Sequence, residues 1–142
     1  SMRKTEQRLW DRMRKHAAAL APKLRLERVE NLAGVGMPDV LAIASGRVVW
    51  LELKSVDAYP AREVSRVLGA TKGLSVAQRN WHYEWYAHSG KSFVVVGVGT
   101  ADVFAIPGAL ADSINFMSHK DLQRQCAADS WATLFEQLDP FS

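Results

Sequence analysis

Cysteine and long apolar runs are both scarce in this 142-residue sequence. Its single cysteine, Cys126, excludes an internal disulfide and a cysteine-rich zinc site, so we interpret it as a small buried side chain. No apolar stretch approaches the length of a membrane span, and no charged-then-apolar signal sequence is present. We therefore expect a cytoplasmic protein with no membrane partner.

Histidines are few and lack a metal-binding spacing. His82 and His88 fall on one predicted helix, but no His-x-x-x-His or other ligand spacing joins them to an acid. We therefore assign these histidines no chemical role. Trp81 and Trp85, one turn apart on the same helix, are better explained as core residues than as a surface for unpaired bases.

Acidic residues are outnumbered in the first half of the chain. Residues 1–73 carry 14 Lys and Arg against 8 Asp and Glu, whereas residues 74–142 carry 4 against 7. A basic surface attracts a phosphate backbone by charge and by counterion release, although such charges are also typical of a solvated helix face. We favour DNA as the partner of the following residues: Arg8, Arg12, Lys15, Arg62, Arg66 and Lys72.

The hydrophobic residues, 48% of the chain, favour one domain over residues 1–142. Helix is predicted for residues 4–20 and 75–89, and strand for residues 24–31, 40–44, 47–54, 92–97 and 102–106. Residues 107–142 are predicted to be a helical extension, with helices at 109–117, 120–128 and 131–138. The basic segment 57–74 is long enough to face a substrate or to form a dimer arm.

A hairpin is the most informative local pattern. Ser45-Gly46 is a candidate two-residue turn between the strands 40–44 and 47–54. Counting outward from this turn places Asp39 opposite Glu52, and opposed residues have Cβ atoms roughly 4.5–5.5 Å apart on one face. Lys54 returns to that face two residues later. Two such close carboxylates favour a shared cation, since like charges that face each other destabilise a strand pair.

The register has an alternative. A three-residue loop would pair Asp39 with Leu51 or Leu53 and separate the two acids, and Ser-Gly is a weaker turn signal than Asn-Gly. In that case the hairpin would be an ordinary buried one with acids at its frayed end.

The motifs 36-GMPD-39, 50-WLELK-54 and 75-SVAQRNW-81 together resemble the PD-(D/E)xK nuclease superfamily. Within it, their order is most similar to the VRR-NUC and phage Holliday-junction-resolvase-like branch. The resemblance covers about residues 6–97 and implies an α/β fold with a restriction-endonuclease-like core, a mixed central sheet flanked by helices. It also implies residence in a bacterial or phage-infected cell.

The resemblance implies roles for the motif residues. Asp39 and Glu52 would bind Mg²⁺ or Mn²⁺, to which the Leu53 backbone carbonyl would add an oxygen; such oxygen ligands suit these hard cations. Lys54 would orient or help deprotonate the attacking water and offset negative charge in the transition state. Gln78 would lie near the active site, although Ser75 and Gln78 also form a capping-box pattern that explains the glutamine by itself.

A third acid is expected from the first helix. Glu6 lies one turn before Leu9 and Trp10 on the apolar stripe of that helix, so it would point towards the sheet. It is explained equally well as a first-turn acid that follows Thr5 as N-cap. Glu30, near the end of the first strand, is the alternative acid.

The resemblance also implies the reaction. We expect a Mg²⁺- or Mn²⁺-dependent endonuclease that hydrolyses phosphodiester bonds in branched DNA such as Holliday junctions, as a homodimer, in recombination or repair. Alternatives are a restriction-like or repair nuclease acting on flap or linear DNA, and a non-catalytic DNA-binding module. The module is disfavoured because it has no need for adjacent carboxylates at Asp39 and Glu52.

Overall fold

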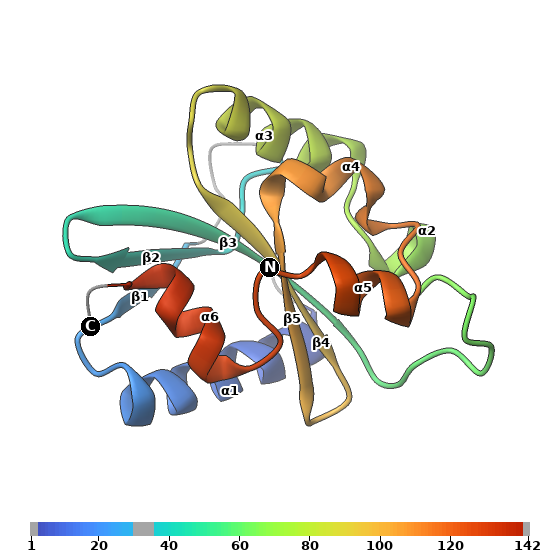
Figure 1. Cartoon of the computed structure of the whole chain (residues 1–142), viewed down its shortest axis with the longest axis horizontal. Helices are drawn as coiled ribbons and strands as arrows, with labels where there is room; N and C mark the ends of the chain where they lie inside the picture. Colours follow the sequence, from blue (N-terminus) through green and yellow to red (C-terminus); the bar gives the residue numbers. More distant parts are fainter. Residues whose placement is uncertain (1–2, 30–35, 141–142) are drawn as a thin grey trace.

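A mixed sheet forms the centre of the molecule. The computed structural model describes residues 3–29 and 36–140, and within these residues the sheet has five strands in the order β1-β2-β3-β4-β5 (Figure 1). They are β1 (Arg25–Arg28), β2 (Val40–Ala44), β3 (Arg47–Val56), β4 (Ser92–Val98) and β5 (Asp102–Pro107). Only β3 and β4 are parallel; the other neighbouring pairs are antiparallel. The predicted α/β class with a mixed sheet is confirmed.

Helices flank this sheet and form the predicted C-terminal extension. They are α1 (Lys4–Leu20), α2 (Gly69–Lys72), α3 (Val76–Ala87), the 3₁₀ turn η1 (Gly108–Leu110), α4 (Ala111–Ile114), α5 (His119–Gln125) and α6 (Trp131–Leu138). The first and last have the predicted bounds. The extension is less helical than expected near residue 127, because Ala127 and Ala128 instead exchange backbone hydrogen bonds with Ala105 of the edge strand β5.

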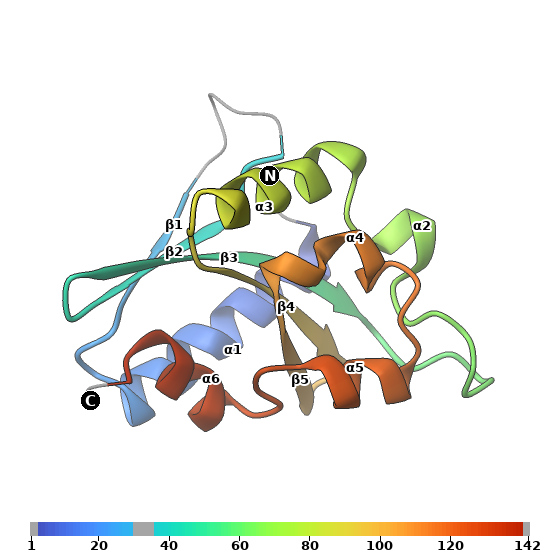
Figure 2. The ribbon, with the colours of Figure 1, turned by 45° about the horizontal axis from the view of Figure 1, so that its top comes forward.

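The two faces of the sheet have separate cores. On one face, α1 and α6 pack on β2 and β3 through a cluster that includes Leu9, Met13, Leu51, Leu53 and Phe135. On the other, α4 and α5 pack on β4 and β5 through a cluster that includes Val94, Val96, Ile106, Ile114 and Leu122. Figure 2 shows α3 above the sheet on the same side as α4. Alternate residues of β3 therefore point into different layers.

The hairpin between β2 and β3 has the predicted register. Ala44 lies opposite Arg47, and Val40 lies opposite Leu51. Ser45 and Gly46 both have positive φ, 52° and 74°, as a two-residue hairpin turn of type I′ requires. The three-residue loop that would have separated the acids is excluded.

Gly36 brings the segment before β2 against the start of α3. Its φ is +84°, and a Cβ atom at this position would lie 2.3 Å from the carbonyl oxygen of Ala77. Any larger residue would therefore combine a strained backbone with a steric clash. The close approach holds Asp39 and Gln78, each a few residues from this contact, in one region.

We predict that Gly36→Ala destabilises the protein by at least about 2 kcal/mol, since it adds the clash to the cost of a left-handed backbone. Urea unfolding measures the change. Gly46→Ala is the matched control, because Gly46 also has a positive φ of +74° but no atom within 4 Å of an added Cβ. Equal destabilisation by the two variants would show that the clash with Ala77 adds nothing to the loss of stability.

Candidate active site

One cavity collects most of the predicted site residues. It has a volume of about 360 Å³ and lies between the start of α1, the end of the β2–β3 hairpin that is remote from its turn, α2 and the start of α3. Its lining consists of Arg3, Glu6, Asp39, Glu52, Lys54, Ala70, Thr71, Lys72, Gly73, Ser75 and Gln78. We call it the acid cavity.

Asp39 and Glu52 form the centre of the acid cavity. Continuing the strand register one position beyond the Val40–Leu51 pair places them opposite each other. Asp39 Oδ2 accepts a hydrogen bond from the backbone N–H of Leu53, at 3.1 Å, which holds its carboxylate against β3. Glu52 is 1% exposed, and within the described residues its Oε1 atom has no hydrogen-bond partner.

The surroundings of Glu52 oppose its ionisation. Burial raises the pKa of Glu52 well above its ordinary value, and the neighbouring charge of Asp39 raises it further. The positive charge of Lys54 lowers the pKa of Glu52 but does not offset these effects. A bound cation would stabilise the ionised form of this carboxyl.

Lys54 lies where the alternation of β3 predicted. Its side chain is 8% exposed and lines the acid cavity, while Leu53 points into the opposite core with α1. An ammonium group therefore shares one small space with the two carboxylates. The predicted role of the Leu53 carbonyl stays a prediction, as do the catalytic roles of Asp39, Glu52 and Lys54.

Glu6 reaches the acid cavity from the first turn of α1. It is 6% exposed, and its Oε2 accepts from Arg3 Nε at 2.7 Å and Nη2 at 2.6 Å. The helix begins at Lys4, so Arg3 rather than Thr5 is the N-cap, and it makes no side-chain capping bond. Glu30, the alternative acid, lies outside the described residues.

Gln78 combines both of its predicted uses. Its Oε1 accepts from the N–H of Ser75 at 2.9 Å, and Ser75 Oγ accepts from the N–H of Gln78 at 3.1 Å, which completes the capping box of α3. Its Nε2 donates a long hydrogen bond, 3.5 Å, to Glu52 Oε2. One amide thus caps the helix and contacts the buried carboxylate.

The predicted DNA-binding residues are distributed more widely. Lys72 lines the acid cavity, whereas Arg12 donates from Nη2 to the carbonyl oxygen of Gly99 at 3.2 Å. The guanidinium of Arg66 lies 4.4 Å from the ring centroid of Phe116. The remaining three are exposed: Arg8, Lys15 and Arg62. Of these six residues, the structure brings Lys72 alone into the cavity.

Sequence reasoning missed two residues beside the acids. Arg3 was not identified as a partner of Glu6, and His82 was assigned no chemical role. His82 is fully buried on α3, with Nε2 3.8 Å from Glu52 Oε1. The available signal was the spacing of four between Gln78 and His82, which places both on one helix face.

The donors present fit a hard divalent cation. Among residues 3–29 and 36–140, no group of three or more His, Cys, Asp or Glu side chains is gathered so that it could hold a metal ion. Mg²⁺, however, is commonly held by one or two carboxylates and keeps several waters. The Asp39–Glu52 pair, with a buried oxygen that lacks a partner, meets that smaller requirement.

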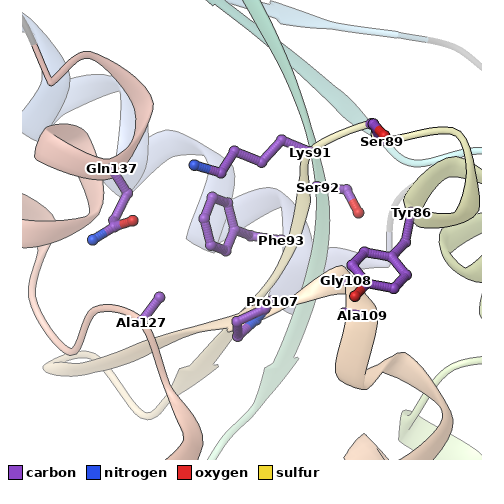
Figure 3. Close-up of a pocket in the computed structure, with 11 residues that line it drawn as sticks. Tyr86, Ser89, Lys91, Ser92, Phe93, Pro107, Gly108, Ala109, Ala127 and Gln137 are labelled. Atoms are coloured by element: carbon purple, nitrogen blue, oxygen red, sulfur yellow. The ribbon is translucent and has the colours of Figure 1, made fainter.

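A second cavity is chemically different. It has a volume of about 380 Å³ and lies beside the start of β4 and the end of β5 (Figure 3). Phe93, Pro107 and Ala127 are among its lining residues, and none of the lining residues is acidic. The acid cavity is therefore the better candidate for hydrolytic chemistry.

Comparisons with known proteins support the fold. No protein-family model matches the sequence, and no curated protein sequence matches it either. Among solved structures, the chain is similar to the Holliday junction resolvase Hjc of the archaeal hyperthermophile Archaeoglobus fulgidus, with a TM-score of 0.59 and 12% identity. The match covers 90% of this chain and 98% of that chain. The chain has the restriction-endonuclease-like fold. None of the helices in the described part of the chain is long and apolar enough to cross a membrane.

We predict that Glu52→Gln stabilises the metal-free protein at pH 8 relative to wild type, because the amide removes the cost of burying an ionisable carboxyl beside Asp39. Folding raises the pKa of Glu52 above its ordinary value of 4.5, so the folded protein holds a proton that the unfolded chain releases. Wild-type stability therefore falls as pH rises from 4.5 towards the raised pKa. Thermal unfolding in chelator measures this dependence.

Added Mg²⁺ supplies the control for this experiment. Ligand binding to the folded state raises its melting temperature, so Mg²⁺ is expected to stabilise wild type at pH 8 and to leave Glu52→Gln unchanged. A variant less stable than wild type in chelator would contradict the repulsion that we assign to the acid pair.

Proposed function

We propose that this protein is a Mg²⁺- or Mn²⁺-dependent DNA endonuclease that hydrolyses phosphodiester bonds in the acid cavity. The observation that carries the proposal is the burial of Glu52 opposite Asp39, with one carboxylate oxygen lacking a partner among the described residues. This arrangement would destabilise a core that binds no cation, because two negative charges repel each other strongly in a low-dielectric space. A cation beside a phosphate would remove that penalty.

Each residue of the cavity has a role in this proposal. Asp39 and Glu52 would hold the ion, which when bound supplies Lewis-acid polarisation of the phosphate. Lys54, from the same face of β3, would hold the attacking water and stabilise the negative charge that grows on the phosphate oxygens. Gln78 contacts Glu52 Oε2 and so limits its rotation. In the reaction, the water oxygen would bond to phosphorus as the bond to the leaving oxygen breaks; the water would lose a proton to solvent, and the leaving oxygen would take one up from solvent.

Charge around the cavity supports a DNA substrate. Lys72 lines it, and Arg8 and Lys15 are exposed on α1, the helix whose first turn supplies Glu6. Phosphate contacts of this kind fix the register of a nucleic acid and release counterions, so they confer a strong dependence on salt. The six predicted basic residues would thus act by guiding the backbone rather than by reading bases.

Branched DNA is the substrate favoured by the motif resemblance and by the structural similarity. The three motifs resemble the VRR-NUC and phage Holliday-junction-resolvase-like branch, and a solved structure with this fold is a Holliday junction resolvase. A homodimer with two-fold symmetry would present two acid cavities to a two-fold junction. Such an enzyme would act in DNA recombination or repair.

Asp39→Ala tests the assignment most directly. We expect it to lower the cleavage rate at least about 100-fold with Mg²⁺ or Mn²⁺, because it removes half of the acid pair that would hold the ion. Cleavage of labelled four-way junction, flap and linear duplex DNA, followed side by side on gels, measures the rate and ranks the substrates. Asp112→Ala, at an exposed acid of α4, is the matched control and should cleave like wild type.

Two results would overturn the proposal. Equal cleavage by Asp39→Ala and wild type would mean that the acid cavity is not the active site. Tight binding of all three DNAs without metal and without cleavage would instead indicate a DNA-binding module. A preference for flap or linear duplex DNA would keep the chemistry but replace junction resolution by the alternative nuclease function.

A further inference from the structure

Two buried atoms face each other behind the acid cavity without hydrogen-bond partners. Within the described residues, Glu52 Oε1 and His82 Nε2 are the buried side-chain nitrogen and oxygen atoms that lack a partner. They are 3.8 Å apart, and their residues are 1% and 0% exposed. Buried polar atoms are nearly always hydrogen-bonded, so a facing pair of unsatisfied atoms calls for an explanation.

The other nitrogen of His82 is held firmly. His82 Nδ1 lies 2.7 Å from the hydroxyl of Ser92, which is itself 6% exposed at the start of β4. Gly108 leaves the space for this contact, because a Cβ atom there would lie 2.0 Å from Ser92 Oγ and 3.1 Å from His82 Nδ1. Figure 3 shows Ser92 next to Gly108, with Phe93 pointing to the other side of β4.

One face of α3 contacts both oxygens of Glu52. Gln78 Nε2 lies 3.5 Å from Oε2, and His82 Nε2 lies 3.8 Å from Oε1. The two residues are one turn apart on α3, so the helix presents one nitrogen to each oxygen. The helix thus places a side-chain nitrogen near each oxygen of Glu52 at the back of the acid cavity.

We propose that His82 is a positioning residue that orients the Glu52 carboxylate for a divalent cation, through a buried chain from Ser92 to His82 to Glu52. This inference rests on the proposed nuclease function and deepens it. Outer residues that orient a ligand are known to change metal affinity about 10–100-fold when they are replaced. Here the ligand is the carboxylate and the outer residue is the imidazole.

The direction of each hydrogen bond in the Ser92–His82–Glu52 chain follows from what its two end groups can donate or accept. An ionised Glu52 only accepts, so Nε2 must carry the ring hydrogen, and Nδ1 must accept from the Ser92 hydroxyl. In a neutral ring the single hydrogen then lies on Nε2, which leaves Nδ1 to accept from the Ser92 hydroxyl 2.7 Å away. A shift of less than about 1 Å brings Nε2 and Oε1 within ordinary hydrogen-bond distance.

The same three residue types occur in serine hydrolases, but the packing excludes that chemistry here. Ser92 is buried, and Gly108 lies so close to Ser92 Oγ that even a methyl group would not fit between them. A nucleophile needs room for the substrate carbonyl next to its oxygen. Ser92 therefore holds the ring of His82.

Metal affinity, measured without DNA, tests the proposal. Calorimetric titration with Mn²⁺ should give a dissociation constant about 10–100-fold higher for His82→Phe than for wild type, since phenylalanine fills the space but cannot donate to Glu52. His82→Gln, whose amide nitrogen replaces Nε2, should recover most of the affinity. His88→Phe is the matched control. It changes an exposed histidine at the C-terminal end of α3, and it should bind Mn²⁺ like wild type.

The tautomer of His82 supplies a test that needs no variant. Nitrogen NMR of the Mg²⁺-saturated wild-type protein should show the ring hydrogen on Nε2, donated to the ionised Glu52 carboxylate. Hydrogen on Nδ1 in the Mg²⁺-saturated protein would overturn the inference, even if His82→Phe fails to fold.

The outcomes separate this inference from the proposed function. Equal Mn²⁺ affinity of wild type and a folded His82→Phe, with junction cleavage intact in wild type, would overturn the role of His82 alone. Wild-type protein that neither binds Mn²⁺ nor cleaves DNA would overturn the proposed function, and the role of His82 with it. Lower affinity in His82→Phe with recovery in His82→Gln would support both.

Discussion

Repulsion between two carboxylates is the constraint around which the site is built. A two-residue turn at Ser45-Gly46 sets the register of the β2–β3 hairpin, and that register brings Asp39 opposite Glu52. Because Glu52 is almost fully buried, water does little to screen the two charges. Two neighbouring groups reduce the repulsion. Lys54 supplies a positive charge beside Glu52, and the backbone N–H of Leu53 donates a hydrogen bond to the Asp39 carboxylate.

Helix α3 shows how few residues are needed to surround such a pair. Its N-cap residue Ser75 forms a capping box with Gln78, whose amide also contacts Glu52, and His82 lies one turn further on behind the same carboxylate. The close contact of Gly36 with Ala77 brings the segment that carries Asp39 against this helix. A shift of α3 would therefore disturb helix capping and the orientation of Glu52 together.

The fold and the chemistry rest on different evidence. The chain's fold is similar to that of a solved resolvase, with a TM-score of 0.59 at 12% identity, which establishes architecture. Restriction-endonuclease-like architecture does not by itself specify a reaction, since function depends on the site that a fold carries. In this chain the acid cavity favours the proposed hydrolysis, and the basic residues favour the proposed DNA substrate.

Local patterns in the sequence determined the elements whose signals lie within a few residues. The stripe of α1, the capping box of α3 and the two-residue hairpin turn each predicted structure correctly, because helix periodicity, capping and turn geometry depend on neighbouring residues. The hairpin register even placed Asp39 opposite Glu52. Only the tertiary structure decided which distant groups surround that pair. Ser92 of β4 lies against His82, and His82 lies behind Glu52, because β4 and α3 meet the hairpin in space. No spacing along the chain encodes those contacts, since they depend on how separate elements pack together.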